Sequence, residues 1–118
     1  MLLDTPVARP TRAIVEPPPA PSSADDTLLS LLARNAATHA RRVALRERDL
    51  GIWHEYTWRD YLDQVVALAA GLEALGFEPA EPMLVIGDNR ARLYFAMLAA
   101  AALRGVPAPI YPEVPPEE

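Results

Sequence analysis

Two residue types with reactive side chains are missing from this chain of 118 residues, which contains neither cysteine nor lysine. Without cysteine there is no disulfide framework and no thiolate metal site, and the absence fits a reducing compartment. Because all 11 basic side chains are arginines, the chain has no ammonium group for a phosphate and no amine for Schiff-base chemistry. These two absences limit the reactions open to the chain.

Long apolar runs and clustered glycines are also scarce. The longest apolar run extends only from Leu93 to Leu103, whereas a membrane-spanning helix needs about 20 residues. The N-terminus lacks the continuous apolar stretch of a signal peptide. The five glycines stand singly, so the sequence has no glycine-rich phosphate loop. We therefore expect a cytoplasmic protein without a transmembrane segment.

The composition that remains is that of one globular domain at most. Hydrophobic residues make up 51% of the chain, enough for a core, and the net charge of −5 argues against a nucleic-acid partner. Residues 1–25 contain six of the 13 prolines, which cannot pair as a strand or wind as a helix. We predict a Pro-rich flexible tail over 1–25, with a ligand for a proline-recognising domain as the less favoured alternative, and a folded part over 26–118.

Two helical patterns occur in the first half of the folded part. Asp26 or Thr27 is suited to cap the first helix. Thr57 is suited to cap the second, with Asp60 three residues on in a variant of the capping box, and Gly76 is placed to close that helix. The apolar stripe of the second helix is formed by Tyr61, Val65, Leu68, Leu72 and Leu75.

Between these helices the pattern is that of a β-hairpin. Two short β-prone runs, residues 43–47 and 52–56, are separated by a turn that contains Gly51. Trp53 belongs to the second run and Trp58 to the first turn of the following helix. We predict that both rings are buried where the strand meets the helix, with stacking on a ligand as the less favoured alternative.

The last third of the sequence predicts a βαβ unit with parallel strands. Residues 83–87 read as a strand buried on both faces, Asp88 or Asn89 as the cap of a helix closed by Gly105, and residues 106–111 as a further strand. That helix is apolar nearly all round and needs more cover than the other predicted elements supply. The predicted fold class is α/β, an incomplete N-terminal part of a layered α/β domain with a β-hairpin, a βαβ parallel unit and flanking helices.

Several of these segments, in this order and spacing, resemble the N-terminal part of AMP-forming acyl-CoA synthetases, most of all the long-chain fatty-acid ligases. The resemblance rests on "GIWHEYTWRDY" with the helix after it, and on "GDNR" leading to "GVPAPIYP". It implies that residues 26–118 are an N-terminal fragment of an AMP-binding domain. One departure is that Ala91, Arg92 and Leu93 stand where the family pattern has Pro-Glu and then Trp.

For the complete enzyme the resemblance implies fatty-acid activation with ATP and Mg²⁺ and transfer of the acyl group to coenzyme A. The family's Ser/Thr/Gly-rich loop ending in Pro-Lys-Gly, its aromatic-Gly-x-Thr-Glu stretch and its catalytic Lys are all missing from this sequence. We therefore assign no catalytic, cofactor-binding or metal-binding residue, and expect no adenylation by this chain alone. The implied partners are the remainder of the ligase chain and, in the complete enzyme, a fatty acid.

The strongest candidate site is "GDNR", Gly87 to Arg90, between a predicted parallel strand and a helix. Ligands of open α/β sheets bind at such strand ends, and helix N-termini favour anions. Because no glycine-rich turn accompanies it, we favour simple capping by Asp88 and Asn89.

Other polar and basic residues are interpreted as structural or solvated. The two histidines have no partner at metal-ligand spacing, the acidic pairs mark a helix start and the chain end, and the methionines fill the core. Four clustered arginines are read as exposed strand and turn charges, with a phosphate or lipid-headgroup site as the alternative. These residues are His39 and His54; Asp25 and Asp26; Glu117 and Glu118; Met83 and Met97; and Arg41, Arg42, Arg46 and Arg48.

Two alternatives to a ligase segment remain open, a stand-alone protein-interaction module and an inactive remnant of such a ligase.

Overall fold

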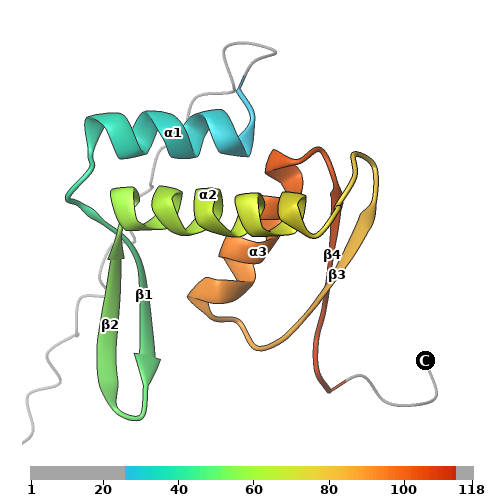
Figure 1. Cartoon of the computed structure of the whole chain (residues 1–118). Helices are drawn as coiled ribbons and strands as arrows, with labels where there is room; N and C mark the ends of the chain where they lie inside the picture. The colour runs from blue at the N-terminus through green and yellow to red at the C-terminus, as the bar shows by residue number, and fades with distance from the viewer. Residues whose placement is uncertain (1–25, 114–118) are drawn as a thin grey trace, which may run out of the picture.

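The computed structural model describes residues 26–113, in which three helices pack with a β-hairpin and a pair of parallel strands (Figure 1). The predicted tail over 1–25 and the terminal Glu117 and Glu118 lie outside the described residues. The predicted fold class is confirmed by an antiparallel hairpin, a parallel strand pair and three helices. In chain order the elements are α1 (Leu28–Thr38), β1 (Val43–Asp49), β2 (Ile52–Thr57), α2 (Trp58–Ala74), β3 (Pro82–Ile86), α3 (Ala91–Ala102) and β4 (Val106–Ile110).

Capping boxes begin the first two helices. The Thr27 side chain accepts a hydrogen bond from the Ser30 amide, and the Thr57 side chain accepts one from the Asp60 amide. The Asp60 carboxylate in turn accepts from the hydroxyl and the amide of Thr57, and these hydrogen bonds lower the pKa of Asp60 below its ordinary value. Helix α2 closes as predicted, with Gly76 in the left-handed region at φ 88°.

The predicted hairpin is confirmed, and its turn has two residues. Asp49 pairs with Ile52, which leaves Leu50 and Gly51 as the loop, at φ 46° and 83°. Positive φ at both central positions is the pattern of a type I′ turn, whose twist matches that of the strands.

The predicted βαβ unit is confirmed, because β3 and β4 pair in parallel with α3 between them. The expectation that residues 83–87 are buried on both faces is wrong for the described part of the chain. Met83 and Val85 are half-buried against α3, whereas Leu84 and Ile86 point to the other face and are exposed. A strand alternates its side chains between two faces, and only one face of this pair is covered.

The end of α3 differs by one residue from the prediction. Arg104 takes the left-handed conformation, at φ 59°, and Gly105 follows it. Gly105 is required for space, since a Cβ there would lie 2.5 Å from the ring of Phe77. The amide of Gly105 donates to the carbonyl of Ala100 and completes the helix end.

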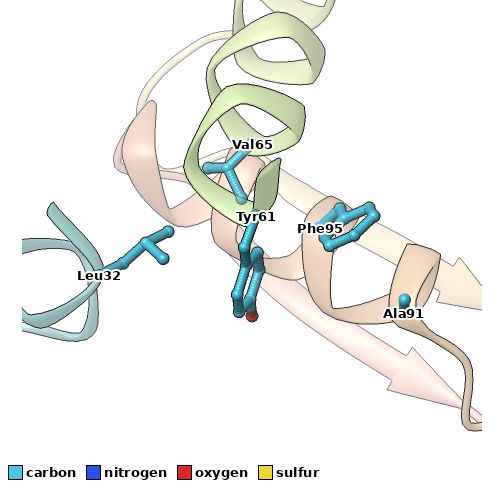
Figure 2. Close-up of a cluster of buried hydrophobic side chains, with 5 residues drawn as sticks. All are labelled: Leu32, Tyr61, Val65, Ala91 and Phe95. Atoms are coloured by element: carbon cyan, nitrogen blue, oxygen red, sulfur yellow. The ribbon is translucent and has the colours of Figure 1, made fainter. Parts of the chain in front are cut away.

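The core lies where the three helices meet, and Figure 2 shows its five side chains. The Phe95 ring packs edge-on against Tyr56 at 5.3 Å between centroids and lies 5.2 Å from Tyr61. Burial raises the pKa of Tyr61. The predicted stripe on α2 is buried only in its first half, since Leu68 and Leu75 are exposed. The cluster consists of Leu32, Tyr61, Val65, Ala91 and Phe95.

Only one of the two tryptophans packs as predicted. Trp58 lies against the core cluster and stacks on Tyr61, with ring centroids 6.4 Å apart. The prediction of a buried ring is wrong for Trp53, which is 63% exposed. Trp53 stands opposite Arg48 in the hairpin and so shares the outward face with that side chain.

Candidate functional site

A shallow hollow of about 240 Å³ lies where β3 and β4 end and α3 begins. This is the place that the sequence marked with "GDNR", at the carboxyl ends of parallel strands. The hollow is lined by Gly87, Asn89, Leu93, Tyr94, Met97, Pro109, Ile110 and Tyr111. Most of this surface is apolar, with two phenol rings and one amide as its polar groups.

The predicted capping of α3 by Asp88 or Asn89 is wrong. The N-cap residue is Arg90, and its side chain makes no capping hydrogen bond. Asn89 turns instead toward the hollow, where its Oδ1 accepts a hydrogen bond of 2.6 Å from the hydroxyl of Tyr94.

The cap of α3 comes from the hairpin. Glu47 on β1 accepts a 2.9 Å hydrogen bond from the amide of Ala91 through Oε2, and one of 3.2 Å from the Tyr56 hydroxyl through Oε1. Burial, followed by this hydrogen bond to Glu47, raises the pKa of Tyr56. A carboxylate at a helix N-terminus satisfies a free amide and faces the positive end of the helix dipole. The anion-binding position at this helix start is therefore taken by the chain's own Glu47.

A second link joins the same two elements. Arg90 donates to Asp49 at 3.1 Å, and this hydrogen bond raises the pKa of Arg90 above its ordinary value. The inner face of the hairpin is thus attached to the start of α3 at both Glu47 and Asp49. Sequence reasoning missed Glu47, because the contact joins residues 44 positions apart and leaves no local pattern.

The other candidates from the sequence do not assemble into a reactive site. His39 and His54 are exposed on different elements, and within residues 26–113 no three His, Asp or Glu side chains gather to hold a metal ion. Arg41, Arg42 and Arg48 are exposed, and Arg46 pairs with Glu55 at 2.8 Å. Both methionines are half-buried. No helix in the described part of the chain is long and apolar enough to cross a membrane.

Several solved structures have a similar fold. A fatty acid AMP ligase from Legionella pneumophila has a TM-score of 0.70 and 20% identity over 75% of this chain. The N-terminal subdomain of NpsA from Klebsiella oxytoca has a TM-score of 0.67 and 23% identity over 75%. Acetoacetyl-CoA synthetase from Streptomyces lividans has a TM-score of 0.68 and 31% identity over 72%. The chain spans only 16%, 22% and 13% of these three structures, respectively.

A search of curated proteins gave no match. A family profile described as "AMP-binding enzyme" matches residues 32–118, which is most of the chain. The family match and the shared fold agree with the resemblance found in the sequence. The chain therefore belongs to the AMP-binding enzyme family of adenylate-forming ligases.

Proposed function

We propose that this chain forms the N-terminal portion of a cytoplasmic fatty-acid–CoA ligase, which activates a fatty acid with ATP to an acyl-adenylate and transfers it to coenzyme A. The family match over residues 32–118 supports this proposal most directly. Two of the similar structures are named for parts of a related reaction, a fatty acid AMP ligase and an acetoacetyl-CoA synthetase. The fatty-acid substrate and the cofactors ATP and coenzyme A are assigned to this protein only as part of the proposal.

The described residues do not themselves fit ATP or Mg²⁺. Phosphoryl chemistry needs cations and clustered amides to offset developing charge, but the chain has no lysine and its glycines stand singly. The first amide of α3 is occupied by Glu47. In this proposal the reacting groups and the site for coenzyme A belong to the remainder of the ligase.

The contribution of this chain is then structural. The hairpin and α3 are locked together through Glu47 and Asp49. The parallel pair offers the remainder of the enzyme an apolar face formed by Leu84, Ile86 and Val106. Parallel sheets are normally covered on both faces, so such a face is suited to packing.

The test is to express the native gene region, including any coding sequence adjoining codons 1–118, and to measure acid-dependent exchange of pyrophosphate into ATP. Fatty acids should support exchange and, with coenzyme A, should yield acyl-CoA. Acetoacetate and aromatic acids serve as matched controls and should give little exchange.

A preference for acetoacetate or an aromatic acid would refute the fatty-acid assignment and leave the family intact. A product that activates no acid would favour the interaction module or the inactive remnant.

A further inference from the structure

The turn of the hairpin exposes three large apolar side chains. Leu50 is 96% exposed, and Ile52 and Trp53 are each 63% exposed. In Figure 1 this turn lies at the end of the β1–β2 hairpin that points away from α1 and α2. Scattered exposed apolar residues are ordinary, whereas three large apolar side chains within four residues of one turn suggest a contact surface that uses both faces of the hairpin end.

Leu50 is a poor residue for this turn on two counts. It holds φ at 46°, a conformation that suits Asn or Gly and costs energy with a large side chain. It also leaves that side chain in solvent. A residue that breaks a local rule without any gain in packing is expected where function requires it.

The charges of the hairpin are mixed, with two arginines and three carboxylates, and they divide between its two faces. On the outward face Arg48 stands opposite Trp53, and within residues 26–113 it forms no ion pair. The acidic side chains of the hairpin are engaged, since Glu55 pairs with Arg46 and Asp49 pairs with Arg90. Arg48 is two residues from Leu50, or about 7 Å along the strand.

The hairpin is also held in place. Its inner face is attached to the start of α3 by Glu47 and Asp49, with contacts of 2.9 and 3.1 Å. An apolar turn on an anchored hairpin need not be ordered when it binds, which lowers the cost of binding.

We propose that this hairpin tip binds the surface of an anionic phospholipid bilayer. Leu50, Ile52 and Trp53 enter the interfacial layer, where apolar faces sink about 5–10 Å and tryptophan is favoured. At that depth Arg48 meets the headgroup phosphates, whose charge complements it. The tip carries the cation of Arg48 behind an apolar end, and this order of groups matches the acyl and phosphate layers of an anionic bilayer. The proposal does not depend on the identity of the acid that the ligase activates.

The experiment adds the full chain to phosphatidylcholine vesicles with and without about one-third phosphatidylglycerol. Binding is followed by co-sedimentation and by tryptophan emission. We expect weak, reversible binding to the anionic vesicles with a blue shift from Trp53. The W53F variant should still bind, but the shift should disappear because Trp58 already packs against the core.

The decisive variant is L50N. Asparagine suits the left-handed turn, so the thermal midpoint should not fall, while binding should weaken by about tenfold. R48Q should weaken binding to the anionic vesicles by about fivefold and leave binding to neutral vesicles unchanged. The matched control is L75S, which removes a leucine that is 87% exposed on another element and should leave binding unchanged.

The proposal is overturned if no vesicle binds, whether or not a protein partner is captured. It is also overturned if L50N binds like the parent, or if L75S weakens binding as much as L50N does.

Discussion

At the scale of single residues, Glu47 joins three elements through one carboxylate, because it lies on β1 and accepts from Tyr56 on β2 and Ala91 on α3. We predict that E47A lowers the free energy of unfolding by about 2 kcal/mol, since a partly buried amide and hydroxyl lose a charged acceptor. Urea unfolding monitored by circular dichroism measures this loss.

The matched control for E47A is E55A, on the outward face of the same hairpin. Within residues 26–113 Glu55 pairs only with Arg46, in solvent, so its removal should change stability by no more than about 0.5 kcal/mol. Equal losses in the two variants would mean that Glu47 does not cap α3.

Asp60 contributes to the free energy of unfolding in a pH-dependent way, because hydrogen bonds from Thr57 lower its pKa in the folded chain below the ordinary 3.8. A depressed carboxyl pKa stabilises the fold above the unfolded value, and the gain is lost as pH falls through the folded value. D60A should therefore cost about 0.5 kcal/mol at neutral pH, with the difference shrinking below 3.8. A difference that stays constant down to the acid transition would contradict this account.

At the scale of elements, the sequence predicted what local chemistry determines. The Thr57 cap, the Gly51 turn and the Gly76 helix end are all found as predicted. It failed where a distant partner decides the outcome. Capping of α3 by Asp88 or Asn89 was a local expectation, and Glu47 on another element takes that role. The ring of Trp53 was predicted to be buried because it is close to Trp58 in the sequence, but the alternation of side chains along β2 turns it outward.

A substitution at Gly105 tests how closely the end of α3 packs against Phe77, which follows α2. A Cβ at Gly105 would meet the Phe77 ring at 2.5 Å, so G105A should destabilise the chain by about 2 kcal/mol. Gly71 lies within α2 with nothing within 4 Å of an added Cβ, so G71A should stabilise by about 0.8 kcal/mol. Chemical denaturation of both variants measures the difference. Loss of stability in G71A, or none in G105A, would show that this packing is described incorrectly.

At the scale of the whole molecule, the described part of the chain leaves one face of the parallel pair exposed, with Leu84 and Ile86 on β3 pointing outward. An uncovered apolar face promotes self-association. We predict that the double variant L84T/I86T shifts the purified chain toward the monomer in gel filtration and changes its unfolding free energy by no more than about 1 kcal/mol. If both proteins elute as the same stable monomer, the exposed face does not need a cover.

The sequence predicted that an apolar helix at residues 93–103 needs more cover than the chain supplies, and in the described part of the chain uncovered surface is found on this helix as well as on the sheet. Ala99 and Ala100 of α3 are fully buried, but Tyr94 is 38% exposed and Met97 is only half-buried. The helix packs against α2 and β4, and the rest of its surface is partly exposed.

The central claim is that this member of the AMP-binding enzyme family holds part of the scaffold of a ligase and none of its reacting groups. Its most direct test is to incubate the purified 118-residue chain with ATP, Mg²⁺, a fatty acid and coenzyme A, and to quantify AMP. We predict no AMP above that of a sample without protein. Fatty-acid-dependent release of AMP by the purified chain would contradict the claim.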